Sequence, residues 1–87
     1  MKALSRIQRI QNAHSFLSES DCRKLLVFGY QAAWTEVESM LEDGDEVEEP
    51  AKFAQMIFEE DIEEFCEMSR EDVKNNLAFV EEFILTN

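Results

Sequence analysis

Very little in this chain interrupts a regular backbone, because its 87 residues include only two glycines and one proline. Between these breakers, apolar residues recur at steps of three and four, with no run of alternating β-branched residues. That spacing is typical of helices with one apolar face, whereas a half-buried strand needs a period of two. The sequence therefore predicts an all-α protein, a compact bundle of about four helices.

The length of the chain bounds its organisation. A chain of 87 residues, 45% of them hydrophobic, can bury one modest core and is too short for two domains. We therefore expect residues 1–87 to form a single acidic helical domain.

Two serines mark expected helix starts. Ser18 and Ser69 are each followed three residues later by an aspartate, a pattern that resembles a capping box with Asp in place of Glu. We expect one helix from near Glu19 to about Glu42 and a last helix after Ser69.

Periodicity predicts the other two helices, from about Ala3 to Leu17 and from about Ala51 to Met68. Pro50 suits the first turn of the latter, because its missing N–H has no helical partner there. A loop of about six residues is expected just before it, where Gly44 and its neighbours break the period.

The charge of the chain is large and unevenly distributed. Eight basic and 20 acidic residues give a formal net charge of −12. Up to Trp34 there are five basic residues against two acidic ones, and after it three against eighteen. Direct binding to nucleic acid or to an anionic membrane is therefore disfavoured. No apolar run reaches the roughly 20 residues of a membrane span, and no signal segment opens the chain, so we expect a cytoplasmic protein.

The acidic residues form two groups that we take as the candidate partner-binding residues. The first group surrounds the expected loop, and the second forms one face of the third expected helix, where residues three and four apart stand about 5–6 Å from one another. The candidates are Glu42, Asp43, Asp45, Glu46, Glu48, Glu49, Glu59, Glu60, Glu63, Glu64 and Glu67.

Two polar residues fall at positions where the helical period expects core. His14 is expected to be a semi-buried, hydrogen-bonded imidazole, since no second histidine completes a catalytic or metal pattern. Asp61 is expected to be a paired structural acid, because burying a lone carboxylate is costly. Its expected partner is His14 or one of three arginines, Arg6, Arg9 and Arg23.

No catalytic residues, metal site or cofactor are expected. The sequence lacks a phosphate-binding loop, a nucleophile elbow, a CxxC pair and an HExxH motif. The acidic loop lacks the D-x-[DN]-x-[DN]-G order of a calcium loop. Cys22 and Cys66 are expected to be buried free thiols. The chain is therefore predicted to be non-enzymatic.

Two hypotheses for its function remain. In the first, the carboxylates imitate a nucleic-acid backbone and dock into the basic groove of a nuclease or defence complex. Small acidic helical domains used in this way include immunity proteins and anti-restriction or anti-CRISPR proteins, although no motif ties this chain to one of those families.

In the second hypothesis, the chain is a non-catalytic adaptor or a homodimeric assembly module whose acidity serves solubility. Phe79 and Phe83 widen the apolar face of the last helix beyond what four short helices can cover.

Overall fold

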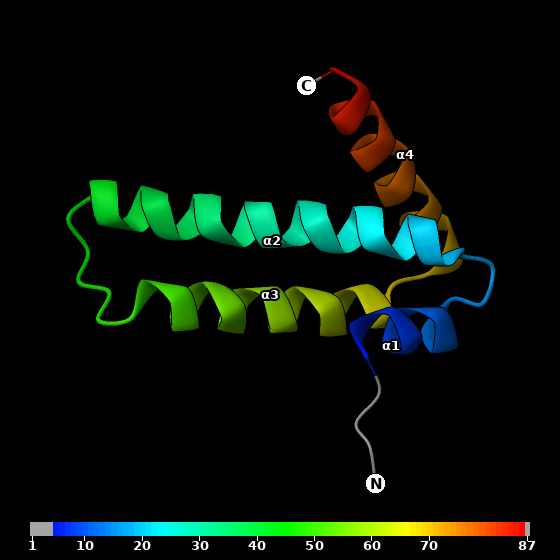
Figure 1. Ribbon diagram of the computed structural model, residues 1–87, viewed down its shortest axis with the longest axis horizontal. Coiled ribbons are helices and arrows are strands. Elements are labelled where there is room, and N and C mark those ends of the chain that lie inside the picture. The colour runs from blue at the N-terminus through cyan, green and yellow to red at the C-terminus, as the bar shows by residue number, and fades with distance from the viewer. Residues whose placement is uncertain (1–4, 87) are drawn as a thin grey trace, which may run out of the picture.

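The computed structural model describes residues 5–86, with side chains described as far as Phe83. That part of the chain contains no strand and folds into helices α1 (Arg6–Ala13), α2 (Glu19–Glu42), α3 (Pro50–Glu67) and α4 (Arg70–Thr86) (Figure 1). The expected all-α fold of about four helices is confirmed.

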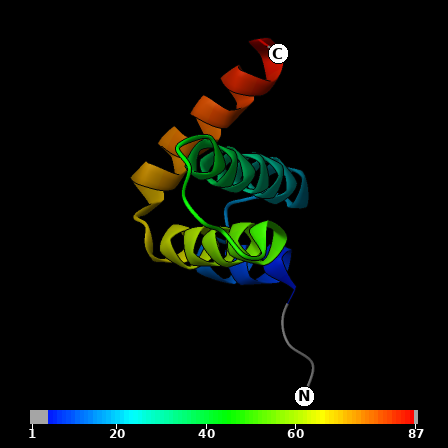
Figure 2. The same ribbon diagram turned by 90° about the vertical axis from the view of Figure 1, so that its left-hand side faces the viewer.

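Helices α2 and α3 form a long antiparallel hairpin, and the two other helices meet it at the end opposite the hairpin loop (Figure 1). The short α1 lies beside the C-terminal part of α3, while α4 starts near the beginning of α2 and diverges from the hairpin (Figures 1 and 2). The C-terminal end of α4 therefore projects away from the rest of the molecule.

The core lies where the four helices meet. Every helix contributes to it, together with Leu17 from the connection between α1 and α2. The buried members are Ile10, Leu17, Cys22, Ala33, Phe58, Ile62 and Val73. Burying these side chains supplies the main driving force for folding, because each buried aliphatic or aromatic side chain contributes about 1.5–3 kcal/mol.

Helix α1 is shorter than predicted. It begins at Arg6 because Ser5 and Gln8 form a complete capping box, in which Ser5 Oγ accepts from the Gln8 N–H at 3.2 Å. It ends at Ala13 instead of Leu17, since the backbone of His14 turns out of the helix at φ −136° and ψ 81°. The predicted residues before Ser5 lie outside the described part of the chain.

The other helix boundaries agree closely with the prediction. The Ser18–Asp21 capping box starts α2 at Glu19, and Ser69 Oγ accepts from the Asp72 N–H at the start of α4. Pro50 occupies the first turn of α3. Gly44, just after α2, has a φ of 87°, a conformation that L-residues with a Cβ rarely adopt.

Candidate protein-binding surfaces

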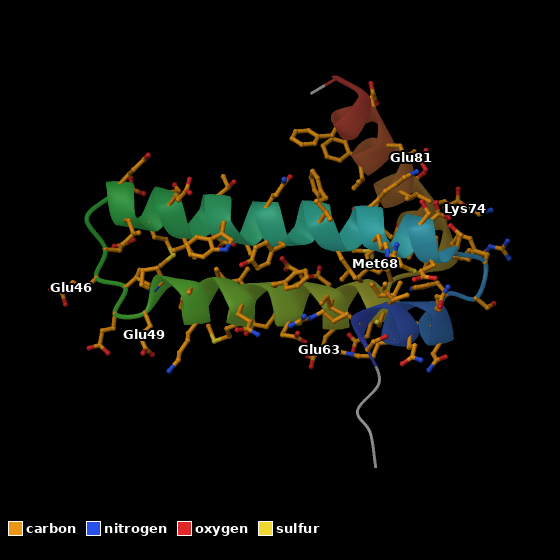
Figure 3. All side chains as sticks on the ribbon, in the orientation of Figure 1. Glu46, Glu49, Glu63, Met68, Lys74 and Glu81 are labelled. Atoms are coloured by element: carbon orange, nitrogen blue, oxygen red, sulfur yellow. The ribbon has the colours of Figure 1, made fainter. Side chains whose placement is uncertain are left out.

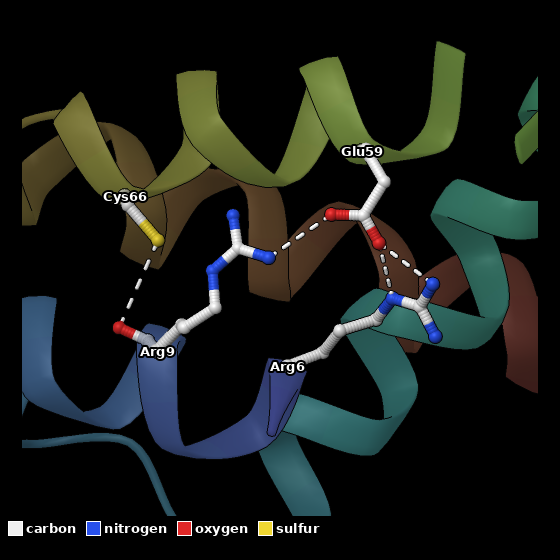
Figure 4. Close-up of polar contacts among 4 residues, drawn as sticks. All are labelled: Arg6, Arg9, Glu59 and Cys66. Atoms are coloured by element: carbon white, nitrogen blue, oxygen red, sulfur yellow. Dashed lines mark hydrogen bonds and ion pairs between the residues drawn. The ribbon is translucent and has the colours of Figure 1, made fainter. Parts of the chain in front are cut away.

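Glu59 on α3 is held by two arginines of α1 (Figure 4). Arg6 Nη2 lies 2.6 Å from Glu59 Oε1, and Arg9 Nη1 lies 3.0 Å from Glu59 Oε2. Hydrogen bonds from Arg9 and then Arg6 hold the pKa of the Glu59 carboxyl below its usual value. The charge of this candidate residue is thus balanced within the fold, where it fastens α1 to α3.

Four other candidates form the exposed outer face of α3. The acidic stripe consists of Glu60, Glu63, Glu64 and Glu67, all of which are exposed. Within the part of the chain whose side chains are described, none of them takes part in an ion pair. Four uncompensated carboxylates therefore stand together on one helix face.

The remaining candidates gather at the hairpin end, where Glu42, Asp43, Asp45, Glu46, Glu48 and Glu49 are all exposed. Figure 3 shows Glu46 at the loop, and Glu49 and Glu63 pointing away from α2 along one edge of the molecule. Lys52 and the exposed Met56 lie on α3 between this loop and the stripe. Lys52 Nζ lies 3.1 Å from Glu49 Oε2. The loop and the stripe are thus two acidic patches along one edge.

His14 is a structural residue, as predicted. It is 6% exposed, and its Nε2 lies 3.0 Å from the backbone oxygen of Phe65. The rings of Phe16 and Phe65 meet it edge-on, with centroids 6.2 and 5.7 Å away. The imidazole therefore links the end of α1 to α3.

The prediction for Asp61 is wrong. This residue is exposed, and among the described side chains it forms no ion pair, while Arg6 and Arg9 are engaged by Glu59. The physical reason is the divergence of α4, which leaves this side of α3 uncovered. Partial desolvation of the Asp61 carboxyl, followed by the charges of Glu64, Glu36 and Glu60, raises its pKa.

A groove opens beside Asp61, between α2, α3 and α4. Its volume is about 200 Å³. Apolar side chains form most of its wall, and Asp61 and Glu64 are the only charged residues among the described side chains that line it. Sequence reasoning missed this feature because it depends on the angle at which α4 leaves the hairpin.

A second apolar surface lies where α4 crosses α2. Phe79 and Phe83 are 58% and 41% exposed, in agreement with the apolar edge expected on the last helix. Both rings pack edge-on against Phe28 of α2, at centroid distances of 5.7 and 5.3 Å. Lys24 of α2 and Glu81 of α4 add an ion pair of 3.6 Å at this junction.

Both cysteines are free thiols. Cys22 is fully buried, and Cys66 is half-buried with its Sγ 3.8 Å from the Arg9 backbone oxygen. Burial is the largest cause that raises the pKa of each thiol, which disfavours the reactive thiolate.

The chain matches no protein-family model, no curated protein and no solved structure. Within residues 5–86, no group of three or more His, Cys, Asp or Glu side chains is arranged to hold a metal ion. No helix in that range is both long and apolar enough to cross a membrane. Any assignment of function therefore rests on the surfaces described above.

Proposed function

We propose that this protein acts by binding and not by catalysis, as an inhibitor whose carboxylates dock into the basic groove of a partner that acts on nucleic acid. One observation carries the proposal, namely the acidic stripe on α3, where four exposed carboxylates lack any ion pair among the described side chains. Uncompensated like charges on one helix face repel one another. A basic partner relieves that repulsion.

The charge density of the stripe supports mimicry of a phosphate backbone. Glu60 to Glu67 spans about 10 Å of helix axis at a rise of about 1.5 Å per residue, so the four carboxylates average about one per 3.5 Å, in axial steps of about 4.5, 1.5 and 4.5 Å. Each strand of duplex DNA carries one phosphate per roughly 3.4 Å of axis. A groove lined with Lys and Arg to neutralise phosphates therefore meets a similar linear density of charge on α3. The acidic hairpin loop extends the negative field along the same edge (Figure 3).

Capture of partners from a lysate of cells that express the protein tests this function. Wild-type protein is used as bait beside a stripe variant, Glu63→Gln with Glu67→Gln, and a control variant that removes two exposed glutamates elsewhere, Glu38→Gln with Glu71→Gln. Duplex DNA in excess serves as the competitor.

The proposal predicts that wild type and the control variant both capture a nucleic-acid-binding protein. The stripe variant is expected not to capture it, and excess DNA is expected to displace it from the bait. Equal capture by all three proteins, or capture that DNA leaves unchanged, argues against it.

A second candidate function is an assembly module that forms a homodimer, and the exposure of Phe79 and Phe83 favours it. A second copy of the chain packed over this apolar edge shields both rings from water. Sedimentation at micromolar concentration is then expected to give a dimer for wild type and a monomer for Phe79→Ser. A wild-type monomer at that concentration rules the dimer out.

A further inference from the structure

The groove between α2, α3 and α4 combines an apolar wall with an acidic rim. Phe28 and Ala32 of α2, Ile62 of α3 and Val80 of α4 contribute to the wall, while Asp61 and Glu64 supply the charge. Among the residues whose side chains are described, no basic one lines it. We infer that this groove receives a basic amphipathic helix of a partner protein, a step that rests on the proposed function for the basic character of that partner.

The position of the groove explains why a helix fits it. Glu59, which contacts α1, and Asp61 are two residues apart and so point about 200° apart around the axis of α3. Helix α1 therefore covers one side of α3, while α4 diverges from the hairpin (Figures 1 and 2). Asp61 lines the groove, and apart from Ile10 of α1 the other described lining residues lie outside α1. An added helix on this side completes the packing that α4 leaves open.

The size of the groove favours side chains of a protein over a small molecule. Its volume of about 200 Å³ is below the range of about 300–1,000 Å³ that is typical of small-molecule sites. Apolar residues spaced at i, i+3 or i+4 and i+7 on a helix offer a row of anchors for such a groove.

The acidic rim selects a partner with Lys or Arg beside those anchors. Asp61 has no ion pair among the described side chains, and the negative charges of Glu64, Glu36 and Glu60 act on its carboxyl. A cation placed there gains from several carboxylates at once. A second copy of this chain carries a formal charge of −12 and brings acidic surface against acidic surface, so the charges favour a basic partner.

A synthetic peptide tests the inference on the full chain. The probe is a labelled peptide of about 18 residues, made of Leu and Lys, with Leu on one helical face. A peptide of the same composition with scrambled order removes that face. Binding is measured by fluorescence anisotropy at about 150 mM salt, where long-range attraction between exposed charges is screened.

Two variants with the same change in charge locate the binding site. Ala32→Lys fills the groove mouth with a long cationic side chain, and Gln55→Lys places the same side chain on α3 away from the groove. Both positions are exposed and helical, and Lys is a good helix former, so both variants are expected to fold, as circular dichroism checks.

The inference predicts that Ala32→Lys weakens binding of the amphipathic peptide by roughly tenfold or more, while Gln55→Lys changes it by less than about twofold. Equal weakening by both variants, equal binding of the scrambled peptide, or no binding at all overturns it. The stripe variant lies outside the groove lining, so partner capture still tests the proposed function if the groove fails.

Discussion

The attachment of α1 depends on a small set of charges, and Glu59→Gln tests that dependence. Glu59 accepts from Arg6 and Arg9 at 2.6 and 3.0 Å, with the three side chains 36%, 41% and 30% exposed. An isolated exposed ion pair contributes about 0.2–1 kcal/mol after solvent screening. The two short ion pairs share one half-buried carboxylate, so each is expected to lie at the upper end of that range. Together they are expected to contribute about 1–2 kcal/mol to the free energy of unfolding.

Glutamine keeps the size of the side chain and one acceptor but removes the charge. At neutral pH we expect Glu59→Gln to lower the free energy of unfolding by about 1–2 kcal/mol, and the melting temperature by about 4–8 °C for each kcal/mol. The loss is expected to shrink as salt is added. Because the pKa of Glu59 is lowered in the fold, its stabilisation is present above the unfolded glutamate pKa of about 4.3. That stabilisation disappears as the pH falls through the folded pKa.

Urea and thermal denaturation followed by circular dichroism measure the effect. Glu60→Gln is the matched control, because Glu60 lies next in α3, is exposed and forms no ion pair among the described side chains. It is expected to change stability by no more than about 0.5 kcal/mol. If Glu59→Gln is no more destabilising than Glu60→Gln, the ion pairs do not hold α1 and the reasoning is refuted.

Four further substitutions test the account of the fold. Gly29→Ala places a Cβ 3.5 Å from the Phe58 ring, which is an ordinary contact, so it is expected to raise the free energy of unfolding by about 0.5–1 kcal/mol in urea denaturation. Gly44 has a φ of 87°, so Gly44→Ala is expected to lower the free energy of unfolding by about 1 kcal/mol. His14→Ala removes a buried ring and leaves a backbone carbonyl without its 3.0 Å partner, so a loss of about 2 kcal/mol or more is expected in the same assay. The pKa of Asp61 is raised in the fold, so its ionised form destabilises the folded protein at neutral pH. Asp61→Asn is therefore expected to have a higher melting temperature than wild type at pH 7. The difference is expected to vanish below the unfolded aspartate pKa of about 3.9. Opposite signs in any of these measurements contradict the assigned environment.

The helices were largely predictable because their signals are local. The capping serines and Pro50 lie within one turn of the helix starts that they mark, so α2, α3 and α4 begin within about one residue of the predicted positions. The same kind of signal was available for α1, where Ser5 and Gln8 form a capping box that the periodicity argument overlooked.

The surfaces were predicted less well, because they depend on how the helices pack. Helical periodicity assigns Asp61 to the buried side of α3, but it contains no information on how far α4 covers that side. For the same reason, the sequence predicted that Glu59 lies on the acidic face without predicting its arginine partners on α1. The groove and its acidic rim follow from these tertiary arrangements.

The central claim, that the acidic stripe docks into a basic surface, is tested most directly by the rate at which the captured partner associates with the stripe variant. Removing charge at Glu63 and Glu67 weakens electrostatic steering, so association is expected to slow by about tenfold at low salt and to depend less on salt. The control variant, Glu38→Gln with Glu71→Gln, is expected to associate at the wild-type rate. Identical association rates for wild type and the stripe variant at both low and moderate salt contradict the claim.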